Sequence, residues 1–359
     1  MLALCVPLTS LVAGFSGSQP IIIFDAPRAG TTAFQGTVPL VISDSGEIAG
    51  YFVDRHNIFH GFIRSAGGEF TIFDAPGAGT GYLQGTQANG IGDHGKVVGY
   101  FYDANYAYHG FLRAANGTII TIDAPNAGAA RNQGTNVTSI NKDGESAGYM
   151  QDSNFVYHSF VRSSSGTFTS FDAPNVGTAA KQGTVLYEGG LNSQGKTCGF
   201  YFDSNGNVFP FIRKQSGVTI SFDPLKSTLT FPTSINDGGI TVGCALTADS
   251  CYGFIRNPDG ALTTFKVPYR DLGTAGTQPN AISSSGVITG LFGDSNNITH
   301  GFVRSVDGVF SKFDAPGAGS VPGSYQGTTP ESINSAGEIV GYLVDSNQVN
   351  HGFIRVPAP

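Results

Sequence analysis

Short apolar segments rich in β-branched and aromatic residues alternate with short polar turns along the whole chain after residue 20. One unit shows the pattern well, with predicted strands at Thr86–Gly92, Lys96–Tyr102, Tyr108–Arg113 and Thr118–Asp123. Apolar runs of this length, bounded by Gly, Asn and Asp turns, are typical of antiparallel strands. No segment keeps a helical period long enough to compete, so we expect an all-β protein.

Two motifs recur seven times each, which indicates internal repeats. An aromatic-aliphatic-Arg triplet begins at Phe62, Phe111, Phe160, Phe211, Phe254, Phe302 and Phe353. A Phe-Asp-Ala-Pro motif or a variant of it begins at Phe24, Phe73, Ile122, Phe171, Phe222, Phe265 and Phe313. Four antiparallel strands in a unit of roughly 40–50 residues are typical of propeller blades. We therefore predict a seven-bladed β-propeller, formed as a single domain by residues 20–359.

The two ends of the chain are out of phase with the repeat. The chain carries a lone fourth-strand motif at Ile21–Pro27, and after Arg355, where a fourth strand should follow, it continues only to Pro359. Pairing Ile21–Asp25 with Gly352–Arg355 would close the ring and cover an exposed sheet edge that could otherwise promote aggregation. We therefore expect an N-terminal strand to complete the last blade.

The repeat units also resemble a known family. The segments Gly-x-Ile-x-Gly-Tyr-Phe, His-Gly-Phe-Ile-Arg and Phe-Asp-Ala-Pro-Gly-Ala-Gly-Thr are similar to the HAF-type repeats of extracellular bacterial proteins, over nearly the whole chain after residue 20. The family's His-Ala-Phe appears here as His-Gly-Phe or His-Ser-Phe, and two units lack the His. The resemblance implies an exported repeat protein and brings no reaction or catalytic residue with it.

Charge and composition narrow the possible partners. The net charge is −7, and seven of the 19 basic residues occupy one repeated position, so they are dispersed around the ring. Nucleic acid requires a concentrated basic surface, so we expect no such partner. Apart from the first segment, no part of the chain approaches the roughly 18 apolar residues of a membrane span. We also expect a monomer. Residues 1–19 look like a partial secretory signal peptide, which predicts an extracellular or periplasmic protein.

Function is best sought where the repeats differ, at the innermost strands and the loops that lead into them. Amides, hydroxyls and aromatic rings around one funnel suit a glycan or a protein surface. We select as ligand-binding candidates Gln87, Asn89, Asn136, Thr138, Tyr187, Phe231, Gln278, Asn280, Arg131 and Lys181. Channel mouths are also polar in general, so a purely structural surface protein remains an alternative.

Two carboxylates offer a catalytic alternative. Glu188 and Glu331 lie at adjacent levels of units three apart, hence across the predicted channel. Such a pair could perform the acid–base chemistry of a carbohydrate-active hydrolase or lyase, although a chance pairing of this kind arises easily. We expect a non-catalytic binding module first, with no cofactor and no metal. The recurring Asp and His residues, and the calcium-like turn at 203–207, are better explained as parts of turns and blades. The Arg of each triplet and the Asp of Phe-Asp-Ala-Pro, which Lys266 replaces in one unit, suggest a structural ion pair between repeats.

Cysteines give one further expectation. Cys244 and Cys251 flank a hairpin turn and align with Tyr51 and Phe59 of the first unit. Residues on adjacent antiparallel strands approach closely enough for a disulfide, which is plausible in an exported protein. Two buried thiols are the open alternative.

Overall fold

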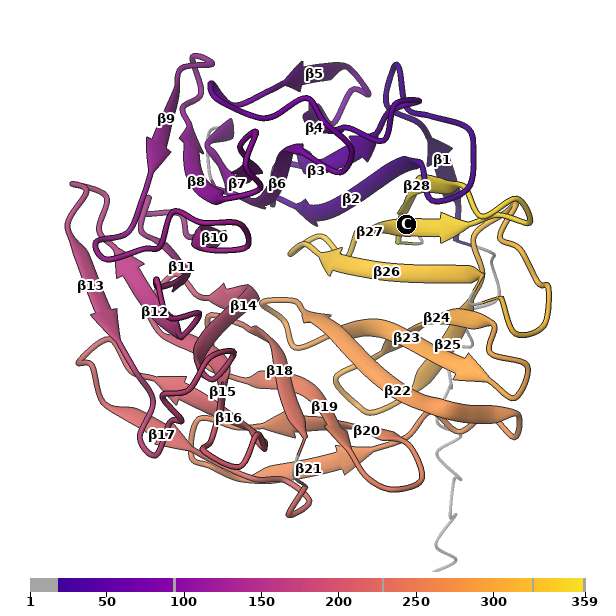
Figure 1. The fold of residues 1–359 in the computed structure, drawn as a ribbon. Helices are drawn as coiled ribbons and strands as arrows, with labels where there is room; N and C mark the ends of the chain where they lie inside the picture. The colour runs from indigo at the N-terminus through magenta and orange to yellow at the C-terminus, as the bar shows by residue number, and fades with distance from the viewer. Residues whose placement is uncertain (1–18, 93–94, 228, 325, 358–359) are drawn as a thin grey trace, which may run out of the picture.

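The computed structural model describes residues 19–92, 95–227, 229–324 and 326–357. Over these residues the chain forms 28 strands and no helix. The strands surround a central axis as a ring of four-stranded antiparallel sheets (Figure 1). The protein is thus an all-β propeller, and 28 strands fit seven blades of four.

Each blade but the last is formed by strands that follow one another along the chain. The first three blades are β2 (Gly36–Ile42), β3 (Ile48–Val53), β4 (Phe59–Arg64) and β5 (Phe70–Phe73); β6 (Gly85–Ile91), β7 (Val97–Tyr102), β8 (Tyr108–Arg113) and β9 (Ile119–Ile122); and β10 (Gly134–Ile140), β11 (Ser146–Gln151), β12 (Tyr157–Arg162) and β13 (Phe168–Phe171). The next two are β14 (Gly183–Leu191), β15 (Thr197–Phe202), β16 (Val208–Arg213) and β17 (Thr219–Ser221); and β18 (Thr230–Ile235), β19 (Thr241–Leu246), β20 (Cys251–Arg256) and β21 (Leu262–Phe265). The last two are β22 (Leu272–Ile282), β23 (Ile288–Asp294), β24 (Thr299–Arg304) and β25 (Phe310–Phe313); and β26 (Gly327–Ile333), β27 (Ile339–Val344), β28 (Asn350–Arg355) and β1 (Ile21–Phe24).

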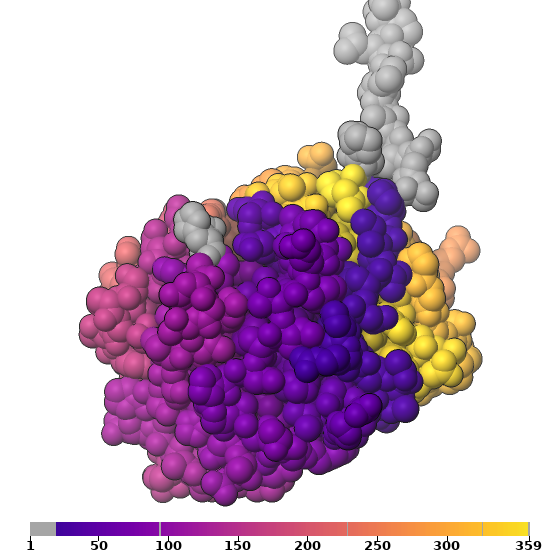
Figure 2. All heavy atoms as spheres, turned by 90° about the horizontal axis from the view of Figure 1, so that it is seen from above, coloured from indigo at the N-terminus to yellow at the C-terminus, as the bar shows by residue number. Residues whose placement is uncertain are grey.

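The ring is closed by strands from the two ends of the chain, as the sequence predicts. Strand β1 pairs antiparallel with β28, with Ile21 opposite Arg355 and Phe24 opposite Gly352. Figure 2 shows the indigo N-terminal segment lying against the yellow C-terminal one. His351 of β28 also lies 3.0 Å from Asp25, just after β1. No peptide bond joins these two strands, so the contact that closes the ring is non-covalent.

Every first strand carries a β-bulge facing the channel. In blade one the pairs Pro39–Gly50 and Val41–Ala49 leave Leu40 without a partner on β3. A bulge bends its strand and redirects a side chain. The first and second strands approach each other closely beside the bulge. A Cβ at Gly50 or at its equivalents would collide with a first-strand carbonyl oxygen, so only Gly fits there. The single bulge residues of the other blades are Asn89, Thr138, Thr233, Asn280 and Glu331, and blade four has a longer bulge between Leu186 and Leu191.

Neighbouring blades are joined by Arg–aromatic contacts. The Phe of each aromatic-aliphatic-Arg triplet is fully buried. The Arg of the same triplet lies over the fourth-strand Phe of the preceding blade, as Arg64 does over Phe24 at 4.9 Å. The same contact recurs in five further blades, while Arg162 lies over Phe168 of its own blade because Ile122 occupies the fourth-strand position. A cation over an aromatic face contributes about 0.5–2 kcal/mol.

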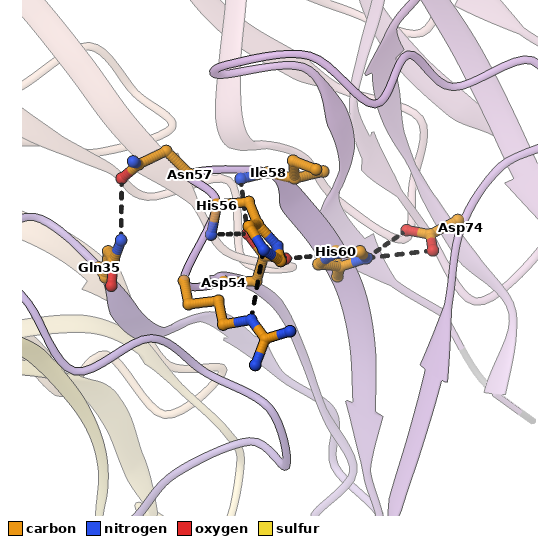
Figure 3. A network of polar contacts seen from close by, with 8 residues as sticks. Gln35, Asp54, His56, Asn57, Ile58, His60 and Asp74 are labelled. Atoms are coloured by element: carbon orange, nitrogen blue, oxygen red, sulfur yellow. Dashed lines mark hydrogen bonds and ion pairs between the residues drawn. The ribbon is translucent and has the colours of Figure 1, made fainter.

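An ion pair between these Arg residues and the Asp of Phe-Asp-Ala-Pro is suggested by the sequence, but it does not form among the described residues. The Asp is bound by a His instead. His60 Nδ1 lies 2.9 Å from Asp74, and its Nε2 lies 3.6 Å from Asp54 of the preceding turn (Figure 3). The turn is held by Asp54 Oδ1, which accepts the backbone N–H groups of His56 and Ile58. The same Asp–His–Asp arrangement recurs at His109, His158, His300 and His351.

These contacts shift the protonation of the His residues. The hydrogen bond to Asp74 raises the pKa of His60 above its ordinary value, against the opposing effect of burial. Hydrogen bonds to Asp123 and Asp172 raise the pKa of His109 and His158 in the same way. The repeated His therefore stabilises the blade in which it lies, which agrees with a structural role.

A disulfide joins Cys244 on β19 to Cys251 on β20, with their Cα atoms 5.9 Å apart. The two residues lie diagonally in the sheet, since Cys244 pairs with Gly253 and Cys251 pairs with Leu246. In the first blade the same diagonal holds the Tyr51 and Phe59 rings, with centroids 5.5 Å apart. The remaining cysteine of the described residues, Cys198, is buried as a free thiol.

Two expectations concern the start of the chain and the membrane. The predicted signal peptide covers residues 1–19, of which 1–18 lie outside the described residues. Within the part of the chain that is described, no helix has the length and apolar character needed to cross a bilayer.

Candidate ligand-binding channel

A cavity of about 310 Å³ lies on the axis of the ring. Residues of the first strands of six blades surround it, from β2, β6, β14, β18, β22 and β26. This volume is at the lower end of the range for small-molecule sites. Its polar lining residues are Asn89, Tyr187, Glu188, Thr233, Ser234, Gln278, Asn280, Thr329, Glu331, Ser332 and Tyr342.

The bulges supply much of this lining. Leu40, Asn89, Thr233, Asn280 and Glu331 are all bulge residues that border the cavity. A residue in a bulge is left out of the ladder, so its side chain can turn toward the axis. The longer bulge of β14 brings two side chains to the same place, those of Tyr187 and Glu188.

Some of these polar side chains also join neighbouring blades. Asn280 Nδ2 donates to the carbonyl of Pro330 at 2.7 Å, and Thr233 Oγ1 donates to that of Pro279 at 2.8 Å. Asn89 Nδ2 donates to Asn136 Oδ1 at 3.1 Å and to the Val137 carbonyl at 3.2 Å.

Asn89 keeps one unused acceptor beside the cavity. The residue is only 4% exposed, and its Oδ1 has no hydrogen-bond partner among the described residues. A buried acceptor without a donor costs about 1–3 kcal/mol. A ligand that donates a hydrogen bond to Asn89 Oδ1 would remove this cost.

Four of the predicted ligand-binding residues line the cavity, namely Asn89, Tyr187, Gln278 and Asn280, and so do the two predicted carboxylates Glu188 and Glu331. The structure therefore brings these six residues together. Each of them lies on a first strand, as the repeat alignment predicts.

The other predicted residues lie outside the cavity, and most of them already contact neighbouring residues. Gln87 accepts a hydrogen bond from the Tyr100 hydroxyl, and Asn136 donates to Tyr149. Phe231 packs on the Phe200 ring, with centroids 5.2 Å apart, and Thr138 donates to the Ala147 carbonyl.

The two basic candidates lie in exposed loops. Arg131 stacks on Tyr106 at 4.1 Å, and Lys181 donates its backbone N–H to Phe155. The axial cavity therefore has no basic residue in its described lining.

The two carboxylates titrate far from their usual range. Burial raises the pKa of Glu188 from 4.5 to about 7. Burial, and to a lesser extent the charge of Glu188, raise the pKa of Glu331 to about 8. Both side chains are half-buried and reached from the channel.

Tyrosines surround this pair. Burial raises the pKa of Tyr342 to about 12, with the charge of Glu331 adding to the effect. Burial likewise raises the pKa of Tyr187, which both carboxylates reinforce. These hydroxyls therefore remain protonated donors at neutral pH. The Tyr187 side chain is 45% exposed, so its ring is accessible to a ligand.

Sequence comparison of the repeats does not reveal two of the lining residues, Leu291 and Tyr342. Both lie on second strands, opposite Gln278 and Thr329. Tyr51 and Tyr100 occupy the equivalent place in their blades, so an aromatic residue recurring after Gly was the available signal.

In the described part of the chain, no group of three or more His, Cys, Asp or Glu residues is placed to hold a metal ion. The calcium-like turn at 203–207 is closed by hydrogen bonds of its own. Asp203 Oδ1 accepts the backbone N–H groups of Asn205 and Asn207, and its Oδ2 accepts the Asn207 side chain.

Comparison with known proteins identifies the fold but no family. No protein-family model and no curated protein matches the sequence. Among solved structures, the chain is similar to a streptogramin B lyase, with 13% identity, a TM-score of 0.55 and coverage of 94% of this chain and 98% of the lyase. It is also similar to the BP39L lectin from Burkholderia pseudomallei, with 10% identity, a TM-score of 0.54 and coverage of 91% and 98%.

An acylaminoacyl peptidase from Pyrococcus horikoshii matches with 10% identity and a TM-score of 0.50, over 87% of this chain and 49% of the peptidase. The neighbours thus include a lectin as well as enzymes. At these identities the likeness shows the fold alone. The fold and the site together define a β-propeller with a polar, ligand-sized cavity on its axis.

Proposed function

We propose that this protein is a non-catalytic binding module that holds a glycan in the axial cavity. The observation that carries the proposal is the cavity itself, in which bulges of several blades place amides, hydroxyls and an exposed Tyr187 ring around one space. Sugars offer many hydroxyl groups for hydrogen bonding and a C–H face that can lie on an aromatic ring. A concave polar site of this volume suits a sugar unit better than a flat protein surface.

Tyr187 gives the sharpest test of this proposal. Tyr187→Ala removes the exposed ring without touching the ladder, so it should weaken glycan binding roughly ten-fold or more while leaving the melting temperature unchanged. Phe34→Ala is the matched control, because Phe34 is exposed (76%) but lies outside the cavity lining. Wild-type protein would first be screened on a glycan array. An array without any binding would favour the purely structural alternative.

A carbohydrate-active enzyme is the second candidate, on the strength of one observation. Glu188 and Glu331 share the cavity, and their pKa values of about 7 and 8 would let one act as an acid near neutral pH. Acid–base cleavage of a glycosidic bond needs such a pair. Release of reducing ends from a bound glycan, lost in both Glu188→Gln and Glu331→Gln, would favour the enzyme. Binding without turnover would favour the binding module.

We further propose that the propeller has seven blades and that the protein is exported. The grouping of 28 strands into fours supports the blade count. The disulfide between Cys244 and Cys251 is consistent with an oxidising compartment outside the cytosol. The resemblance to HAF-type repeats points the same way. Alkylation of cysteines in protein taken directly from its source would test the compartment, since a protected pair indicates an oxidised bond.

A further inference from the structure

Building on the proposed glycan-binding function, we infer that the axial cavity prefers a sugar that carries a primary ammonium group over the same sugar with that nitrogen acetylated. The ligand class is therefore an aminated glycan. The inference rests on the chemistry of the groups that face the cavity.

The cavity holds two carboxyl groups and no cationic side chain in its described lining. Glu188 and Glu331 both line it, and its described lining contains no Lys, Arg or His. No ion pair involves either carboxylate among the described residues. A buried or half-buried carboxylate is costly unless a cation or several hydrogen-bond donors compensate it. A ligand that brings its own positive charge supplies the missing partner.

Asn89 adds an independent observation. The residue lines the same cavity, and its Oδ1 is buried and has no donor within the described residues. Its Nδ2 is already engaged by Asn136 and Val137 of the next blade, so an amide flip would break two hydrogen bonds. A ligand group that reaches Asn89 Oδ1 would satisfy this acceptor by donating a hydrogen bond, which ammonium and hydroxyl groups both do.

The surrounding titratable groups leave this preference intact. The charges of the two carboxylates act on the pKa values of nearby tyrosines, namely Tyr51, Tyr149, Tyr187 and Tyr342, and the charge of Glu188 acts on Glu331. The tyrosines stay neutral because burial raises their pKa values. Burial also raises the pKa of both carboxyl groups. An incoming ammonium group should favour their ionised form and so release a proton on binding.

The test compares two trisaccharides that differ only at nitrogen, a β-1,4 glucosamine trimer and its fully N-acetylated counterpart, by calorimetry at pH 6. A charge-assisted hydrogen bond should make the aminated trimer bind roughly 10- to 100-fold more tightly. Heats measured in buffers of different ionisation enthalpy should show net proton release. Glu188→Gln with Glu331→Gln keeps the shape of both side chains and should abolish the preference, so that the two trimers bind with similar affinity.

Glu69→Gln is the control, since it removes one exposed carboxylate far from the cavity lining and should keep the wild-type preference. Equal affinity of wild-type protein for both trimers would overturn the inference and leave the proposed function standing. Failure of both trimers and of every array glycan would overturn the two together. Spermidine binding as tightly as the aminated trimer would show that an amine alone suffices, which would overturn the sugar class.

Discussion

The N-terminal strand gives the prediction that can be worked out most fully. Phe24 is the inward-facing residue of β1 and is 9% exposed. Its ring lies against Gly352 of β28, beneath Arg64 at 4.9 Å and 6.0 Å from the Phe70 ring. Phe24→Ala removes the side chain that fixes β1 to both neighbouring blades.

The expected loss follows from this burial. Truncating a buried Phe to Ala costs about 3–5 kcal/mol through lost apolar burial and the cavity left behind. Ile22 on the same strand is 49% exposed, so Ile22→Ala should cost less than about 1 kcal/mol. Because β1 is held by only four residue pairs, we expect the loss to appear first as local opening of the strand and only later as unfolding of the ring.

Urea unfolding and hydrogen–deuterium exchange together measure both effects. Phe24→Ala should lower the urea midpoint and speed amide exchange in residues 20–29. Phe313→Ala serves as a second control, because Phe313 lies under Arg355 in the same way but its strand is joined to the chain at both ends within the ring. The closure argument would be refuted by a Phe24→Ala protein whose residues 20–29 exchange as slowly as wild type, or whose stability matches that of Ile22→Ala.

Three other predictions concern the framework. Because the pKa values of His60, His109 and His158 are raised in the folded state, their contribution to stability is fully present below about pH 6.5 and is lost as the pH rises through the raised values. The urea midpoint should therefore fall from pH 5.5 to 8.5, and it should fall less in a triple His→Gln variant. Both proteins would also carry Glu188→Gln and Glu331→Gln, because the raised carboxyl pKa values make stability fall with rising pH as well. A midpoint that stays flat would contradict this. Phe155 adopts a φ of 62°, and Asn57 and Asn297 occupy the same turn position in other blades. Phe155→Asn should therefore raise the free energy of unfolding by about 1 kcal/mol. An unchanged or lower value would show that packing of the Phe155 side chain compensates for the backbone strain. Cys244→Ser with Cys251→Ser should lower the free energy of unfolding by about 2–3 kcal/mol, given a sequence separation of seven residues. Cys244→Tyr with Cys251→Phe introduces the aromatic pair that blade one has at these positions, and it should recover part of the loss. Equal stability of all three proteins would show that the disulfide does not stabilise the fold.

The framework was largely predictable because each blade repeats the same physical solution. Strand β8 begins and ends where the apolar pattern predicts, and the spare motif at the N-terminus pairs with β28 in the expected register. The periodicity of apolar residues and the phase of the repeats carry this information directly.

The contents of the channel were less predictable. A bulge shifts the register by a single residue, as at Leu40, and its local signal is weak: a Pro precedes the bulge residue in four first strands, at Pro39, Pro232, Pro279 and Pro330. Its effect is to send Asn89 and Glu331 to the cavity while Gln87 is held by Tyr100. The predicted ion pair between Arg and Asp does not form for a related reason, because the Asp is already bound by a His on the neighbouring strand. Such competition between partners becomes visible only in three dimensions.

Because strands from opposite ends of the chain close the ring, closure must wait until the last strand has been synthesised. Asp25 and its partner His351 are 326 positions apart. At a translation rate of about 5–20 residues per second, roughly 20 to 60 s pass before the second of them is made. Throughout that interval the first strand has no edge to occupy. A nascent chain of this design therefore stays open at one joint until its last strand leaves the ribosome.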